Sequence, residues 1–133
     1  MHNVSFGKNL FCGPSAVSAI AGITTDEAAS ILSRITGKRK ITGVYLDELK
    51  KAFEFLGYKV QDQNLSARTV YGCLFGLRTD GYYVFMVPRH FIAIEVNGSH
   101  KYICDNHSKN PINASSSARL GDKAIACFRI VKD

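Results

Sequence analysis

The 133-residue sequence contains no long uninterrupted apolar run and no secretory signal. Its most apolar stretch, residues 10–23, is interrupted by Cys12, Gly13 and Pro14, and the segment before it is polar. A membrane-spanning helix needs about 20 consecutive apolar residues, which no part of the chain offers. We therefore expect a cytoplasmic protein with no membrane partner.

Closely spaced cysteines are also absent. The four cysteines are far apart and form no C-x-x-C pair, which predicts free thiols in a reducing compartment. Cys104 and His107 are three residues apart and could contribute to a zinc site, but no second pair at metal-binding spacing accompanies them. We expect no metal and no organic cofactor.

Basic residues outnumber acidic ones, and most of them are scattered along the sequence. Seventeen basic and 11 acidic residues give a net charge of +6, and the only basic cluster is Lys38–Arg39–Lys40. This cluster follows Gly37, which fits the end of a helix, so a solvated loop is the simplest interpretation. Because no aromatic residues alternate with basic ones, nucleic acid is a less favoured partner, and an acidic protein remains an alternative. The sequence does not indicate an oligomeric state.

The chain reads as one α+β domain over residues 1–133. Helical spacing of apolar residues predicts helices over 14–21, from Thr24 onwards with a Thr24–Glu27 capping box, and over 45–56. A short helix is predicted within 66–77, and residues 107–123 read as an irregular polar segment. Strands are predicted over 58–60, 82–87, 90–96, 99–105 and 124–131. Helices followed by antiparallel strands predict N-terminal helices packed on a C-terminal sheet.

Cys12 stands at the predicted start of a buried helix. Gly13 allows a sharp turn into the helix, and Pro14 fits its first position because it has no N–H to leave unpaired. The open N–H groups of the first turn and the positive end of the helix dipole would converge on the sulfur. This position predicts a thiol with a lowered pKa and therefore a nucleophile.

A predicted hairpin brings His90 and Asp105 together. Asn97–Gly98 separates two strand-like runs and favours a two-residue turn. Counting back along both strands from that turn places His90 directly opposite Asp105, with Cβ atoms about 4.5–5.5 Å apart. A carboxylate at this distance can orient an imidazole that acts as a base. The alternative is a surface His–Asp pair without a chemical role, but the nucleophile candidate upstream favours a functional pair.

These segments resemble the papain-like cysteine peptidase superfamily. The resemblance rests on Cys12-Gly13-Pro14-Ser15-Ala16, on His90 at the start of an apolar strand, and on Asp105 after a hairpin, in that order. It covers about residues 9–106 and is greatest for bacteriocin-processing peptidases and their small bacterial and phage relatives. For a phage protein, the compartment would be the host cytoplasm.

The resemblance implies a nucleophile at Cys12, a general base and acid at His90, and an orienting residue at Asp105. Such enzymes place a glutamine six residues before the cysteine to complete the oxyanion hole, whereas this chain has Phe6 there. Asn3 or Asn9 could supply an amide instead, and Asn9 is the closer of the two.

The function predicted from these residues is hydrolysis of a peptide or amide bond through an acyl-thioester, with a protein or peptide as substrate. A deamidase or transglutaminase using the same residues is an alternative. A weak or inactive papain-like module that binds a host protein or nucleic acid is another.

Overall fold

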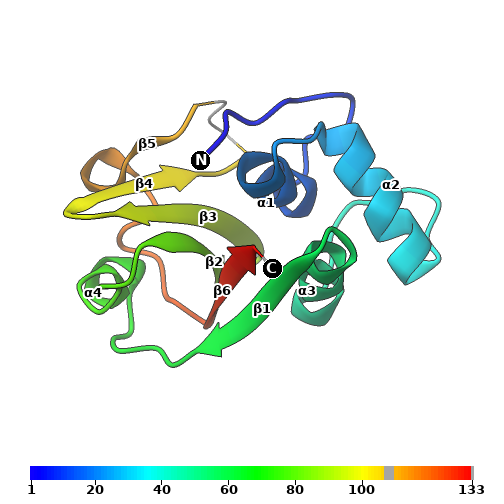
Figure 1. Ribbon diagram of the computed structural model, residues 1–133. Helices are drawn as coiled ribbons and strands as arrows, with labels where there is room; N and C mark the ends of the chain where they lie inside the picture. Colours follow the sequence, from blue (N-terminus) through cyan, green and yellow to red (C-terminus); the bar gives the residue numbers. More distant parts are fainter. Residues whose placement is uncertain (107–109, 133) are drawn as a thin grey trace.

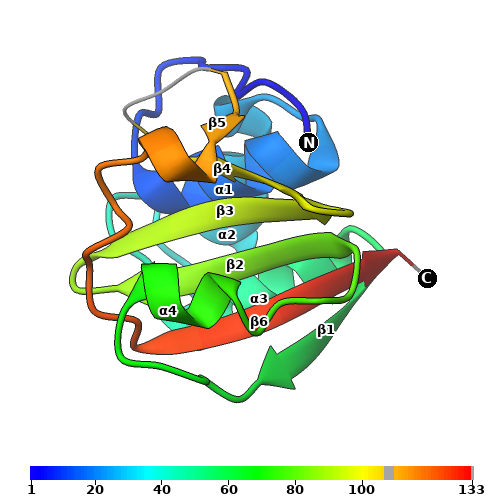
Figure 2. The ribbon, with the colours of Figure 1, turned by 90° about the vertical axis from the view of Figure 1, so that its left-hand side faces the viewer.

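The computed structural model describes residues 1–106 and 110–132. A layer of three helices packs on one face of a β-sheet, and a short helix packs on the other face (Figure 1 and Figure 2). Helices α1 (Cys12–Ala21), α2 (Thr25–Thr36) and α3 (Leu46–Phe55) cover one face of a six-stranded antiparallel sheet (Figure 1). Helix α4 (Val70–Leu74) lies on the opposite face, in front of the sheet in Figure 2. The predicted arrangement of N-terminal helices on an antiparallel sheet is confirmed.

Local sequence explains where the helices begin and end. Thr24 caps α2 by accepting a hydrogen bond from the Glu27 N–H at 3.0 Å, as the capping box predicts. Gly37 ends α2 in the left-handed conformation, with φ 74°. Helix α1 begins two residues before the predicted start, so that Cys12 is its first residue and Pro14 its third. Every residue of α1 from Gly13 to Ile20 is buried, which matches its small and apolar composition.

The sheet order is β1-β6-β2-β3-β4-β5, so the C-terminal strand is inserted between the first two strands of the chain. The strands are β1 (Tyr58–Gln63), β2 (Gly81–Val87), β3 (His90–Asn97), β4 (His100–Cys104), β5 (Ile112–Asn113) and β6 (Ala126–Lys132). Strand β1 is longer than predicted because all six of its residues pair with β6. This pairing joins distant parts of the chain, and local patterns do not reveal it.

The β3–β4 hairpin has a different register from the predicted one. The turn residues are Gly98 and Ser99, and Asn97 stays in β3 opposite His100. Gly98 has φ 61°, as a type II′ turn requires at its first central position, and its N–H donates to Asp80. The prediction that His90 lies directly opposite Asp105 is therefore wrong.

Two apolar clusters, one on each face, hold the sheet between them. The cluster on the α1–α3 face includes Phe53 and Phe128, whose rings meet edge to face with centroids 6.2 Å apart. The cluster on the α4 face includes Phe85 and Ile92. No helix among residues 1–106 and 110–132 is long and apolar enough to cross a membrane.

Candidate active site

Cys12 opens α1 at a helix end that has few hydrogen-bond donors. Phe11, the residue before the helix, provides no side-chain cap, and Pro14 has no N–H. The Ser15 N–H already bonds the Phe11 carbonyl at 3.1 Å. The N–H groups of Cys12 and Gly13 therefore remain as the donors that the helix itself offers to the Cys12 sulfur.

Cys12 and His90 line the same cavity, which has a volume of about 260 Å³. The other lining residues are Gly43, Val44, Met86, Arg89 and Phe91. Cys12 comes from the start of α1 and His90 from the start of β3, and α1 packs against β3. The fold thus brings together two of the predicted site residues that lie 78 positions apart in the sequence.

Close packing shapes the wall of this cavity. A Cβ added to Gly13 would lie 2.8 Å from Cγ2 of Val44, so only glycine allows α1 to approach Val44 this closely. Gly43, next to Val44 in the same wall, faces open space. The position of Cys12 therefore depends on the segment at 43–44.

Burial raises the pKa of the Cys12 thiol above its ordinary value. Hydrogen bonds from the backbone N–H groups of Phe91, Cys12 and Gly13 oppose this effect, and so does the positive charge of Arg119. They do not outweigh burial, so the predicted lowering of the Cys12 pKa is wrong. The helix N-terminus acts in the predicted direction but is weaker than the loss of water around the sulfur.

Asp105 follows β4 directly and lies opposite Ile92 when the observed register is extended. Ile92 and His90 are two residues apart, so Asp105 is a diagonal neighbour of His90 on the same side of the strand pair. Oδ2 of Asp105 lies 3.4 Å from Nε of Arg119, whose Nη1 lies 3.3 Å from Asp122.

Asn106, the next residue, ties this end of β4 to the segment before Cys12. Its side-chain N–H donates to the Leu10 carbonyl at 3.1 Å.

The Asn9 amide is engaged away from the Cys12 cavity. Its Nδ2 donates to the Ile41 carbonyl at 2.9 Å, and its Oδ1 accepts from the Phe11 N–H at 3.0 Å. Asn9 lines a second cavity next to the first one. In this arrangement Asn9 positions Phe11, the residue before Cys12, and one N–H of its amide is already engaged by Ile41. Phe6 packs against the core, and its side chain has no hydrogen-bond donor.

Sequence reasoning missed two cations of the site, Arg89 and Arg119. Arg89 forms the β2–β3 turn with Pro88 and has φ 60°, a conformation that non-glycine residues rarely adopt. Pro88–Arg89 between two strand-like runs could have indicated the turn. Arg119 lies in an irregular segment without periodicity, so no sequence signal placed it near Asp105.

Within the described residues, no group of three His, Cys, Asp or Glu side chains is placed to hold a metal ion. His107, which the zinc alternative requires, lies outside the described residues. The four cysteines are free thiols, as their spacing predicts.

Two solved structures match the chain over nearly its whole length. One is a double-glycine motif protease from an AMS/PCAT transporter in complex with a leader peptide, with 15% identity, a TM-score of 0.61 and coverage of 98% of this chain and 91% of that one. The other is the peptidase domain of Streptococcus ComA, a bifunctional ABC transporter of a quorum-sensing pathway, with 12% identity, a TM-score of 0.63 and full coverage of both chains.

The chain has the papain-like fold of these peptidase domains. The fold predicted from the sequence is thereby confirmed. No protein-family model and no curated protein sequence matches the chain. At 12–15% identity the structural likeness shows the papain-like fold alone, because one fold can carry different chemistries.

Proposed function

We propose that this protein is a cysteine-dependent hydrolase that cleaves a peptide or amide bond with Cys12 as nucleophile. The observation that carries the proposal is the cavity shared by Cys12 and His90 at the N-terminus of a buried helix. The likeness to a protease solved with a leader peptide supports a peptide as the substrate.

Proton transfer and attack on the carbonyl are coupled in this site. Because burial raises the pKa of Cys12, the thiol is protonated at rest and His90 removes the proton as the sulfur approaches the carbonyl carbon. The Cys12 N–H donates to the developing oxyanion. His90 then protonates the leaving amine, and water hydrolyses the thioester to release the acyl group and regenerate the thiol. Asp105 orients His90 from its diagonal position on the hairpin.

Cleavage of a peptide library tests this function. Wild-type protein is expected to cleave members of the library, detected by mass spectrometry as new peptide termini. The Cys12→Ser and His90→Ala variants are expected to lose at least about 100-fold in rate, since nucleophile and base act as one unit. Cys73→Ser, which alters a buried thiol far from the cavity, is the matched control and should retain cleavage. Unchanged cleavage by Cys12→Ser would contradict the proposal.

A second candidate is a papain-like module that binds peptide and turns it over weakly or not at all. Two observations favour it: Phe6 replaces the glutamine, and the Asn9 amide is engaged with Ile41. An oxyanion donor is worth about 10²–10³ in rate, so its loss is compatible with binding and little catalysis. Peptide binding by the wild-type chain without new termini would favour this candidate.

The same thioester also allows deamidation or transfer to an amine. Deamidation leaves the peptide chain intact and adds about 1 Da at a glutamine or asparagine, whereas hydrolysis creates new termini. Mass spectrometry of one reaction therefore separates these outcomes.

A further inference from the structure

A second cavity, of about 400 Å³, lies beside the Cys12 cavity. Phe11 lines it while Cys12, the next residue, lines the first cavity. Ile41 lines it too, and Gly43, two residues later, lines the first cavity. Consecutive Cα atoms are about 3.8 Å apart, so the two cavities are neighbours on either side of these segments.

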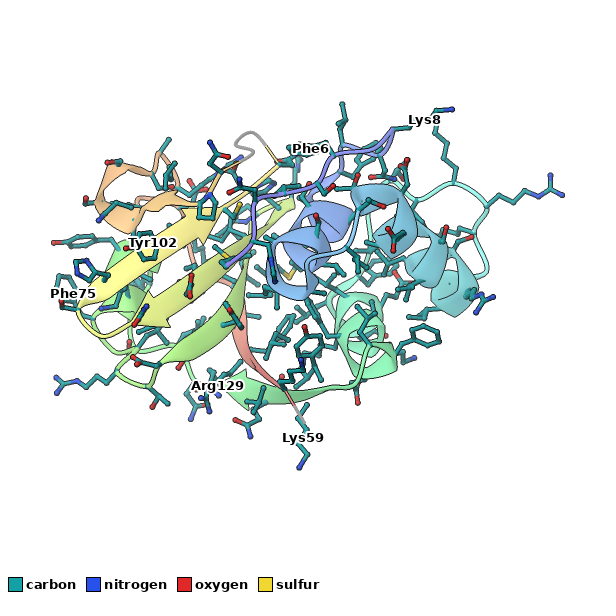
Figure 3. All side chains as sticks on the ribbon, turned by 45° about the horizontal axis from the view of Figure 1, so that its top comes forward. Phe6, Lys8, Lys59, Phe75, Tyr102 and Arg129 are labelled. Atoms are coloured by element: carbon teal, nitrogen blue, oxygen red, sulfur yellow. The ribbon has the colours of Figure 1, made fainter. Side chains whose placement is uncertain are left out.

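The second cavity carries a surplus of positive charge. Lys8, Arg39 and Lys40 line it, against one acidic residue, Asp26. All three basic side chains are exposed, and none of them forms an ion pair within residues 1–106 and 110–132. Figure 3 shows Lys8 at the end of the molecule next to α2, away from Phe75 and Tyr102 at the opposite end.

The one carboxylate of the cavity is held by the backbone. Asp26 accepts hydrogen bonds from the N–H groups of Lys8, at 2.9 and 3.0 Å, and of Asn9, at 2.9 Å. A Cβ at Gly7 would lie 2.1 Å from Asp26 Oδ2, so glycine is required for this approach. Backbone N–H groups satisfy the hydrogen bonding of Asp26 while its charge still attracts Lys8, so Arg39 and Lys40 are the basic side chains most available for a ligand.

The wall on the other side is also fixed by side chains. Ser33 of α2 donates to the Lys38 carbonyl, and Asn9 donates to the Ile41 carbonyl at 2.9 Å. Both ends of the basic segment 38–41 are thus tied to the body of the protein. These hydrogen bonds fix the backbone of the loop, so the loop forms a defined wall of the cavity.

A further cation stands in the first cavity. Arg89 lines it together with Cys12 and His90, and it forms no ion pair within the described part of the chain. The two adjoining cavities therefore carry four basic side chains against the single carboxylate of Asp26, a net charge of +3 around Cys12. Complementarity calls for a ligand with several negative charges.

We propose that the Lys8–Arg39–Lys40 cavity binds acidic side chains of the peptide substrate, so that the enzyme selects acidic sequences close to the scissile bond. The inference rests on the proposed function. Because the second cavity adjoins the Cys12 cavity, it would hold substrate residues close to the scissile bond. Lysine and arginine donate charge-assisted hydrogen bonds to carboxylates. Phe11 and Ala29 provide apolar surface for the aliphatic part of the peptide.

Binding tests the inference without catalysis. The full-length Cys12→Ala chain is titrated into a fluorescein-labelled decapeptide of alternating Glu and Ala, and into the same peptide with Gln in place of Glu. The acidic peptide is expected to bind about tenfold more tightly or better, and raising NaCl from about 50 to about 500 mM should remove most of the difference. The Arg39→Gln/Lys40→Gln variant should lose this preference. The matched control, Lys51→Gln/Lys132→Gln, removes the same charge from exposed sites outside both cavities and should retain it.

The outcomes separate the inference from the proposed function. Equal binding of the two peptides would overturn the inference, whether or not the wild-type enzyme cleaves peptides. Tighter binding of an oligonucleotide of equal charge would overturn it as well, since the site would then select phosphate. Preferential binding of the acidic peptide without cleavage of any library member would support the inference and contradict the hydrolase. In a cleaving enzyme, acidic residues should be enriched near the cut sites of the wild type and not of Arg39→Gln/Lys40→Gln.

Discussion

Nε of Arg119 lies 3.4 Å from Oδ2 of Asp105, while Nη1 of the same guanidinium lies 3.3 Å from Oδ2 of Asp122. The arginine thus joins the irregular segment after β5 to the end of β4. Its positive charge also reaches Cys12, where it lowers the pKa of the thiol against the effect of burial. Arg119 thus acts on Cys12 by charge and on Asp105 by contact.

Replacing Arg119 by Gln should raise the pKa of Cys12 further and slow its alkylation at a given pH, since less thiolate is present. The measurement is the pH profile of Cys12 labelling by iodoacetamide. Asp122→Asn is the control, because it removes one partner of Arg119 and leaves the charge near Cys12 in place. A profile that moves equally in both variants would show that Arg119 acts through the stability of its loop alone.

Cys12 should react ahead of two of the buried thiols, Cys104 and Cys127. Thiolate is the reactive form, so a raised pKa moves labelling to higher pH. Burial raises the pKa of Cys104 to about 11 and that of Cys127 to about 12. At pH 9 only about 1% of Cys104 is ionised. Cys12 should therefore be labelled ahead of both in the folded protein, as mass spectrometry of time points can determine. Labelling of Cys104 or Cys127 before Cys12 would contradict the assignment of Cys12 as the accessible nucleophile.

Much of this fold is predictable because it is encoded locally. The capping box at Thr24, the glycine at the end of α2 and the uniformly small, apolar α1 each follow from a few neighbouring residues. The hairpin register is not fixed in this way, because Asn97–Gly98 and Gly98–Ser99 both suit two-residue turns. The structure has the Gly98–Ser99 turn, in which the Gly98 N–H donates a hydrogen bond to Asp80 in a distant segment of the chain.

The site is less predictable than the fold because its properties arise from packing between distant segments. The order Cys12, His90, Asp105 could be read from the sequence, and the structure places the first two on one cavity. The pKa of Cys12 depends on how deeply the sulfur is buried, which the sequence does not give. Arg119 could not be predicted because the segment that carries it has no regular pattern.

Gly13→Ala should destabilise the protein and disturb the Cys12 cavity. The new Cβ would lie 2.8 Å from Val44, and overpacking of this kind costs about 1–3 kcal/mol. Urea unfolding is expected to show a net loss of about 1 kcal/mol, because alanine recovers part of the cost through helix propensity. Gly43→Ala is the control in the same wall, where the added methyl group meets open space, and it should leave the cavity intact. Equal stability of the two variants would contradict the close approach of α1 to Val44.

Asp26 should make the stability of the 7–9 segment depend on pH. Hydrogen bonds from the N–H groups of Lys8 and Asn9 lower the pKa of Asp26. A carboxyl whose pKa is lower in the folded state stabilises the fold above its unfolded pKa, and this contribution disappears as the pH falls through the folded value. Thermal unfolding between pH 6 and pH 3 should therefore show a smaller drop in Tm for Asp26→Asn than for the wild type. Parallel curves for the two proteins would contradict this role.

Arg89→Gly should remove a positive charge from the Cys12 cavity without destabilising the protein. A left-handed conformation costs a non-glycine residue about 1–2 kcal/mol, which the glycine variant avoids. Glycine loses more conformational entropy on folding, however, and this offsets about 0.5–1 kcal/mol of the gain. Urea unfolding should therefore show equal or slightly greater stability. The ratio of Cys12 alkylation by anionic iodoacetate to that by neutral iodoacetamide should fall, because the arginine no longer attracts the anion. Pro88→Ala changes the other turn residue and should leave this ratio unchanged while costing about 0.4–1 kcal/mol. An unaltered ratio in Arg89→Gly would mean that the guanidinium charge does not reach the sulfur.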